Sequence, residues 1–351
     1  MSLHLERNRI VGSANSDFQA CLAADLGSAL GQMLGSGNVV VTGRDGKGFS
    51  RLMKRALTCG IMENGIQVLD TRLVPTPVVR YCTTDSASDF GVYLGFSSST
   101  PGDLVVSFFD ESGALASGEV VGGLLDRLGS RDRLVSAQEV GDIMFFAQAY
   151  EGYRTELLSA VDTDAIVGSS PRVLLDCSNG AVSVTVPRIL RGLNCDVTSF
   201  HDNAPAYLTH SPVISDDDLM ADFAGEVSDN KADLGLAFDP CGESVRVVDD
   251  SGGVLSQEDL GLILAESTDA GRIAVTKDLE RGRLADRAEI RPLKREYNRI
   301  MPGDLDAALG ADNEMYLAGE HRPWWDAAPF VLKLVEIVSK GQRLSELVAG
   351  L

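Results

Sequence analysis

The hydrophobic positions of this chain alternate between short β-rich runs and longer stripes with helical spacing. The stripe over residues 18–33 repeats at three and four residues, which predicts a helix capped at its start by Ser16. Residues 38–42 (NVVVT) then predict a buried strand, and residues 50–63 predict a second helix. This order of strand, polar loop and helix is typical of an α/β fold.

Three strand–loop junctions of the chain have similar sequences. They read NVVVTGRDGKG, RVLLDCSNGAV and RIAVTKDLERG, and begin at Asn38, Arg172 and Arg272. We therefore predict three consecutive similar α/β domains with mixed sheets flanked by helices, over residues 1–145, 146–252 and 253–351. Ligands of such sheets bind beyond the carboxyl ends of the strands, which is where these loops lie.

The charge balance narrows the classes of partner. The chain has 31 basic and 51 acidic side chains, a net charge of −20, and no long basic run. This argues against nucleic acid and membrane partners. No run of about 18 apolar residues and no secretory signal pattern occurs, so we expect a soluble, cytoplasmic protein. The six cysteines lack CxxC spacing, which predicts neither a zinc site nor a disulfide framework.

Hydroxyl side chains gather where one apolar strand ends. Residues 91–96 predict a strand that runs into Ser97-Ser98-Ser99-Thr100-Pro101, and a second β-rich run follows over residues 104–109. Hydroxyls at a strand end are candidates for the nucleophile of a phosphoryl transfer. The alternative is a Ser/Thr-rich turn, in which the hydroxyls bond the local backbone.

Four motifs occur in an order and at a spacing that resemble the α-D-phosphohexomutases, the phosphoglucomutase/phosphomannomutase family. They are Gly43-Arg44-Asp45, Leu73-Val74-Pro75-Thr76-Pro77, Asp176-Cys177-Ser178-Asn179-Gly180 and the run from Ala232 to Asp239. The resemblance covers nearly the whole chain and implies similar α/β domains around a cleft. Family members have a fourth domain that grips the phosphate of the substrate, and from where the chain stops we expect this domain to be absent.

The resemblance implies a position for the catalytic serine. The loop of the family reads Thr-Ala-Ser-His-Asn-Pro and carries its serine as phosphoserine, and the ungapped count places that serine at Ser97. Ser98 and Ser99 stand in place of the family's histidine and asparagine, and Ser107 in place of a lysine. Arg44 and Lys47, in the loop after the first strand, would then neutralise phosphate charge.

The metal loop of the family reads Asp-Gly-Asp-x-Asp-Arg and holds Mg²⁺. Here the residues are Asp239-Pro240-Cys241-Gly242-Glu243-Ser244, so the resemblance implies Asp239, Cys241 and Glu243 as metal ligands. Mg²⁺ prefers oxygen ligands, and a thiol matches it poorly. Ser244 also lacks the guanidinium that pairs with phosphate oxygens. The resemblance thus implies Mg²⁺, but the residue types favour the alternative, an Asp-Pro-x-Gly turn between two strands.

The sugar-binding loop of the family reads Gly-Glu-x-Ser-Gly. Here it is Gly319-Glu320-His321-Arg322-Pro323, which implies Glu320, His321 and Arg322 as substrate-binding residues. The alternative is an exposed charged loop beside Trp324-Trp325.

The resemblance leaves three functions open. The first is an impaired or repurposed relative of the phosphohexomutases, which includes a non-catalytic sugar-phosphate sensor or partner subunit. The second is an active mutase that transfers phosphate through phospho-Ser97. The third is a phosphatase or phosphotransferase for a smaller substrate. The departures in the catalytic and metal loops favour the first. A hexose phosphate is the expected ligand, and either an oligomer or another chain is open as the element that completes the cleft.

Overall fold

The computed structural model describes residues 3–97, 100, 102–130, 134–203, 212–268, 270–275, 282–292, 305–310, 312–318 and 325–350. These residues form two compact units. The first unit holds the described residues up to Tyr153, and the second holds those from Arg154 onward. No helix of the described residues is both long enough and apolar enough to cross a membrane.

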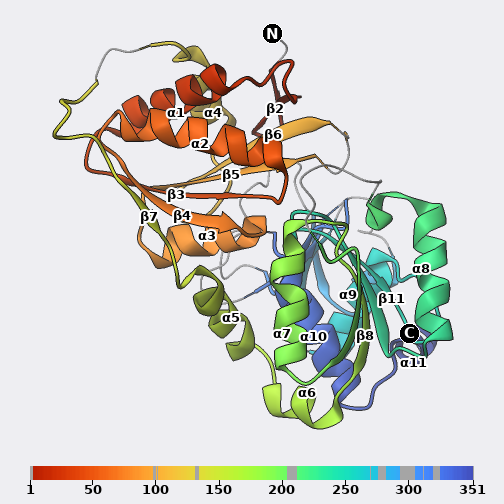
Figure 1. Ribbon diagram of the computed structural model, residues 1–351. Coiled ribbons are helices and arrows are strands. Elements are labelled where there is room, and N and C mark those ends of the chain that lie inside the picture. The colour runs from red at the N-terminus through yellow and green to blue at the C-terminus, as the bar shows by residue number, and fades with distance from the viewer. Residues whose placement is uncertain are drawn as a thin grey trace. The chain divides into compact units, whose positions relative to one another are not determined.

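The first unit is built on one mixed sheet of seven strands, in the order β1-β2-β6-β5-β3-β4-β7. Strand β3 pairs parallel with both β4 and β5, whereas β6 pairs antiparallel with β5 and β2. Helices α1 and α2 cover one face of the sheet, and α3 lies on the other (Figure 1). The elements are β1 (His4–Glu6), β2 (Arg9–Ser13), α1 (Ala20–Leu34), β3 (Val39–Arg44), α2 (Gly48–Met62), β4 (Gln67–Leu73), α3 (Thr76–Asp85), β5 (Phe90–Phe96), β6 (Asp103–Phe109), α4 (Gly118–Asp126) and β7 (Ile143–Phe145).

Two glycines let α1 and α2 approach each other closely. A methyl carbon added at Gly27 of α1 would lie 2.0 Å from the carbonyl oxygen of Leu57, and one added at Gly60 of α2 would lie 1.9 Å from that of Ala24. Real Cβ atoms do not approach a carbonyl oxygen this closely, so both positions require glycine. The apolar stripe expected over residues 18–33 is buried here: Phe18, Leu26 and Leu30 belong to the core of this unit.

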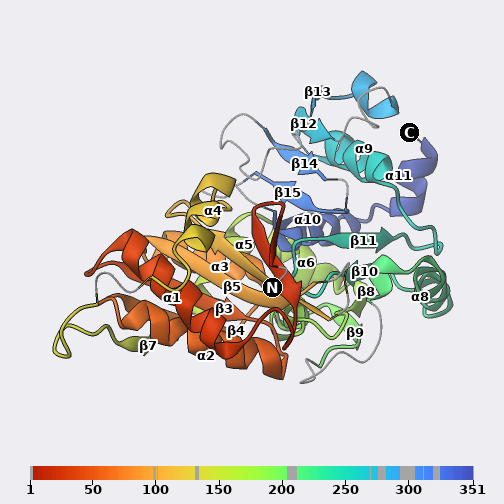
Figure 2. The same cartoon turned by 90° about the horizontal axis from the view of Figure 1, so that it is seen from above.

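Helix α5 (Ala149–Ser159) spans the boundary between the units. The second unit contains two four-stranded sheets, in the orders β11-β10-β8-β9 and β13-β12-β14-β15 (Figure 2). Its remaining elements are α6 (Thr163–Ser169), β8 (Arg172–Asp176), η1 (Ala181–Val184), α7 (Val186–Gly192), β9 (Asp196–Phe200), η2 (Val213–Ser215), α8 (Asp217–Asp229), β10 (Leu234–Phe238), β11 (Val245–Val248), α9 (Gln257–Ser267), β12 (Arg272–Val275), η3 (Arg283–Asp286), β13 (Glu289–Pro292), β14 (Ala307–Leu309), β15 (Met315–Leu317), α10 (Ala327–Ser339) and α11 (Leu344–Gly350).

The two sheets of the second unit are joined by backbone hydrogen bonds. Val245 N donates to Asn313 O at 3.1 Å, Met315 N donates to Glu243 O at 3.3 Å, and Ser244 forms a β-bridge with Glu314. The amide of Ala327, the first residue of α10, also donates to Gly242 O at 3.2 Å. The loop between β10 and β11 is therefore fixed to the sheet that follows it in the chain.

The predicted fold class is confirmed, because the chain forms three mixed α/β sheets flanked by helices. The predicted cap of the first helix is wrong. Helix α1 begins at Ala20 with Gln19 at its N-cap, and Ser16 precedes it in a turn where the amides of residues 16–18 all point to Ser13 O. The division into domains at residues 145 and 252 stays a prediction.

Candidate functional site

Ser97 follows the last residue of β5 and lies in a tight turn. Its amide donates to Asp103 O at 2.9 Å, and its Oγ accepts a hydrogen bond from the amide of Thr100 at 2.9 Å. The side chain is half-buried. This bond is the one that a Ser/Thr turn makes. It is also compatible with a nucleophile, because an accepting hydroxyl keeps its own proton and a second lone pair.

Asp45 connects the loop after β3 to the end of β5. Its Oδ2 accepts from the amide of Phe96 at 2.9 Å and its Oδ1 from the amide of Lys47 at 2.9 Å, while its own amide donates to Leu94 O at 3.0 Å. The side chain is buried, and burial raises its pKa although these hydrogen bonds act in the opposite direction. Asp45 therefore holds the backbone of Lys47 beside the end of β5, the strand that Ser97 follows.

Arg44 and Lys47 are the two cations of this edge that the sequence pointed to. Arg44 pairs with Leu94 in the register of β3 and β5, three residues before Ser97, and its Nη1 donates to Asp45 O at 2.6 Å. Burial lowers the pKa of Arg44, and the nearby charge of Arg51 lowers it further. Burial also lowers the pKa of Lys47, against the opposing effect of Asp45. The structure thus brings Ser97, Arg44 and Lys47 together at the carboxyl ends of β3 and β5. This end of the two strands is called the cationic edge below.

A partly buried ion pair lies in the same unit, near Arg44. Lys54 of α2 binds Asp70 of β4, and Asp70 also accepts from the amide of Arg72 at 2.7 Å. Burial lowers the pKa of Lys54, and the positive charge of Arg44 contributes in the same direction. Arg44 and Lys54 therefore repel each other in a partly desolvated setting, and an added oxyanion would be stabilised beside them. Sequence reasoning missed Asp45, Lys54 and Asp70 as members of the site.

In the second unit, the loop after β10 is organised by Asp239. Its Oδ2 accepts from the amide of Cys241 at 2.9 Å, and its Oδ1 accepts from the amide of Ser244 at 2.8 Å. The carboxylate is buried, which raises the pKa of Asp239 to about 6, and the charge of Glu243 adds to this effect. Gly242 has a φ of 80°, the left-handed conformation that lets the loop turn back.

These residues do not fit Mg²⁺ well. Cys241 offers a soft thiol where the ion prefers oxygen ligands, and Ser244 follows it in place of a cationic side chain. Across the part of the chain that the structure describes, no three His, Cys, Asp or Glu side chains lie together as a metal site. The loop has the hydrogen bonds of a self-contained turn.

The predicted sugar-binding residues Glu320, His321 and Arg322 lie outside the described residues. The neighbouring Asp326 is described. Its Oδ1 accepts from the amide of Ala328 at 3.0 Å and so caps α10.

Two family models match the chain. The model described as phosphoglucomutase/phosphomannomutase, alpha/beta/alpha domain I, matches residues 7–132, and the model of alpha/beta/alpha domain II matches residues 151–252. Among curated proteins, the phosphoglucomutase/phosphomannomutase of Thermococcus kodakarensis is 26% identical over 356 residues, which is 96% of this chain and 77% of that protein. The phosphoglucosamine mutase of Corynebacterium jeikeium is 29% identical, and that match covers 72% of this chain and 58% of the relative.

Solved structures share the fold. A phosphoglucomutase/phosphomannomutase family protein from Burkholderia thailandensis superposes with a TM-score of 0.79 at 20% identity, covering 99% of this chain and 80% of that one. The N-acetylphosphoglucosamine mutase of Aspergillus fumigatus, solved with GlcNAc-6P and magnesium, superposes at 0.50 and 11% identity, covering 89% and 65%. The two family models, over residues 7–132 and 151–252, establish that the chain belongs to the α-D-phosphohexomutase family, the phosphoglucomutase/phosphomannomutase family.

Proposed function

We propose that this chain binds a hexose phosphate and that its phosphoryl transfer is impaired relative to a Mg²⁺-dependent phosphohexomutase. The observation that carries the impairment is the make-up of the loop after β10, where Cys241 and Ser244 follow Asp239 in place of an oxygen ligand and a guanidinium. The family relatives are named for hexose and hexosamine phosphates, which gives the class of ligand.

The cationic edge of the first unit supports phosphate binding. Burial lowers the pKa values of Arg44, Lys47 and Lys54. A phosphate group placed beside them would replace part of the water that these side chains lose, and would offset the repulsion between Arg44 and Lys54. Asp45 keeps the loop in position before the ligand arrives.

The loop after β10 supports impairment. Phosphoryl transfer depends on positioning and on neutralising the charge that develops on the transferred group, and a divalent cation is the usual means. With Cys241 and Ser244 in place of a carboxylate and a guanidinium, that stabilisation falls to the cations of the first unit. Loss of one such electrostatic contribution costs on the order of a hundredfold to a thousandfold in rate.

A second candidate, an active mutase acting through phospho-Ser97, is favoured by one observation. Hydrogen bonds join Arg44 and the amide of Lys47 to Asp45 at the end of β3, and join Asp45 to Phe96 at the end of β5. If these cations alone suffice to stabilise phosphoserine, transfer proceeds without help from the Asp239 loop.

Calorimetry with glucose 6-phosphate and mannose 6-phosphate, paired with a mutase assay in Mg²⁺, separates the candidates. We expect binding that weakens at least tenfold in Arg44→Gln and is unchanged in the control Arg72→Gln, whose guanidinium stacks 3.9 Å over the ring of Phe145. We expect no turnover above that of Ser97→Ala. Turnover that requires Ser97 would establish the second candidate, and absence of binding would contradict both.

A further inference from the structure

Strand β7 forms one edge of the seven-stranded sheet of the first unit. It pairs parallel with β4 on one side, and no strand of the described residues lies on its other side (Figures 1 and 2). Its three side chains, those of Ile143, Met144 and Phe145, are all apolar and exposed. Proteins usually protect a sheet edge with charged side chains, a bulge or a covering helix, because an open edge is a template for another strand. An apolar strand at an open edge therefore indicates a binding surface.

The exposed apolar surface extends beyond the strand. Leu134 and Val140 precede β7 and are exposed to a similar degree, and the exposed fractions of all five side chains lie between 44% and 52%. The other large apolar side chains that are exposed among the described residues lie singly elsewhere in the chain: Leu5, Leu52, Val167, Val184 and Val254. Single exposed apolar residues are normal, whereas a group of them marks an interaction site.

The backbone of β7 also presents hydrogen-bonding groups to its open side. Toward β4, the carbonyl of Asp142 accepts from the amide of Val68 at 2.9 Å, and the amide of Phe146 donates to a β4 carbonyl at 3.0 Å. Alternate residues of a strand bond to the same neighbour, so the backbone groups of Ile143 and Phe145 face away from β4. The amide of Ile143 donates to Oδ1 of Asp142 at 2.7 Å. The carbonyl of Ile143 and both backbone groups of Phe145 therefore point to where a further strand would pair.

This backbone pattern is complementary to itself. When a two-fold axis passes beside Met144, an antiparallel second copy of β7 places Ile143 of each copy opposite Phe145 of the other. Each Phe145 amide then donates to the Ile143 carbonyl of the other copy, while the amide of Ile143 keeps its bond to Asp142. The same pairing sets a β-branched side chain against an aromatic ring, which is a favourable cross-strand combination. Contacts in which one patch serves both subunits are the commonest way in which protein dimers close.

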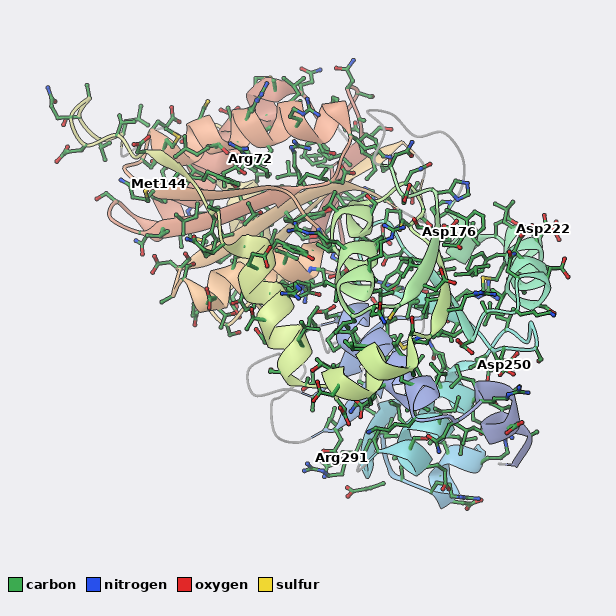
Figure 3. The ribbon with its side chains drawn as sticks, turned by 60° about the horizontal axis from the view of Figure 1, so that its bottom comes forward. Arg72, Met144, Asp176, Asp222, Asp250 and Arg291 are labelled. Carbon is green, nitrogen blue, oxygen red and sulfur yellow. The ribbon has the colours of Figure 1, made fainter. Side chains whose placement is uncertain are left out.

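The charges beside β7 complement each other in the same arrangement. The guanidinium of Arg72 lies 3.9 Å over the ring of Phe145, the last residue of β7, whereas Asp142 precedes the first residue. Figure 3 marks Arg72 and Met144. In an antiparallel pair the start of one strand lies beside the end of the other, so Asp142 of each copy approaches Arg72 of the other. These opposite charges offset part of the repulsion between two chains of net charge −20.

We propose that β7 is a dimer interface, at which the first sheets of two copies of this chain join into one continuous sheet around Met144. Backbone hydrogen bonds between Ile143 and Phe145 set the register. The exposed apolar side chains of residues 134–145 provide the buried surface, and Asp142 and Arg72 pair across the contact. The dimer is independent of the proposed function, because its contacts involve none of the residues placed in the candidate site.

Sedimentation velocity ultracentrifugation of the full chain tests the interface. We expect a dimer whose dissociation constant rises roughly tenfold or more in Met144→Lys and in Met144→Glu, because each variant sets two like charges opposite each other. An equimolar mixture of the two variants should dimerise again, because a lysine then faces a glutamate. Leu52→Lys and Leu52→Glu are the matched controls, at a side chain of α2 that is also 50% exposed, and should dimerise like the unmodified protein.

Three results would overturn the proposal. They are an unmodified protein that stays monomeric up to roughly 100 µM, a dimer that Met144→Lys does not weaken, and folded Met144 variants that fail to associate when mixed. Hydrogen exchange followed by NMR supplies the second readout. The amide of Phe145 should exchange more slowly in the unmodified dimer than in Met144→Lys, because it donates across the interface. Equal exchange rates would show that the dimer does not pair through β7.

Discussion

Asp45 and Phe96 are joined by a hydrogen bond of 2.9 Å that spans 51 positions of the sequence, from the amide of Phe96 to Oδ2 of Asp45. The bond ties the loop after β3 to the residue before Ser97. It fixes Arg44 and Lys47 close to Ser97, the candidate nucleophile. Electrostatic preorganisation requires cations that are held in place in this way before the reaction.

Removing the hydrogen bond between Asp45 and Phe96 should destabilise the first unit. In Asp45→Ala the amides of Phe96 and Lys47 lose their acceptor in a buried setting, partly offset by relief of a buried charge. We expect the free energy of unfolding to fall by roughly 2 kcal/mol, measured by urea denaturation. The exposed Asp126→Ala on α4 is the control, with a change within about 0.5 kcal/mol. Equal stability of the two variants would show that the hydrogen bonds of Asp45 do not stabilise the loop after β3.

The close approach of α1 and α2 makes a second prediction. Gly27→Ala places a methyl group against the carbonyl of Leu57, so the helices must separate, and we expect a loss of roughly 1–3 kcal/mol in urea denaturation. Gly122→Ala in α4 is the matched change, because nothing lies within 4 Å of the added carbon. There the higher helix propensity of alanine should raise stability by up to about 1 kcal/mol. An unchanged free energy of unfolding in Gly27→Ala would contradict the close packing of α1 against α2.

The strands and helices of the first unit were predictable because the apolar runs and stripes are long and face a single core. The start of α3 carries a similarly local signal, because Pro77 lies in its first turn, where proline is favoured. The start of α1 was not, since the turn at Ser13 competes with the cap at Ser16. Contacts such as Asp45 with Phe96, or Asp176 with His201, join residues far apart in the chain and leave no local pattern.

Asp239 predicts a dependence of stability on pH. Its pKa rises from 3.8 to about 6 on folding, so the folded state favours the protonated form. Its contribution to stability is therefore fully present below pH 4 and is lost as the pH rises through 6, a change of roughly 3 kcal/mol. Asp239→Asn lacks this titration. The stability of the variant relative to the unmodified protein should rise by about that amount between pH 4 and pH 7, measured by urea denaturation at each pH. A constant difference between the two proteins would contradict the buried charge.

Magnesium binding should be weak at this loop. We expect titration calorimetry to show no micromolar Mg²⁺ binding that is lost in Asp239→Asn, because Cys241 offers a soft thiol where Mg²⁺ requires an oxygen ligand. Cys241→Asp restores an oxygen donor and should strengthen binding, whereas Cys177→Ser, at a buried thiol outside this loop, should leave it unchanged. Tight Mg²⁺ binding by the unmodified chain would show that the thiol of Cys241 does not prevent the loop from holding the ion.

The most direct measurement is phosphopeptide mass spectrometry of the fragment that contains Ser97, after incubation with glucose 1,6-bisphosphate and Mg²⁺. A phosphoserine carries nearly two negative charges at neutral pH and needs compensating cations. Impaired transfer predicts that Ser97 stays mostly unphosphorylated and that Cys241→Asp raises its occupancy. Substantial phosphate in the unmodified chain that disappears in Ser97→Ala but not in Ser107→Ala would contradict impairment and identify Ser97 as the nucleophile of an active mutase.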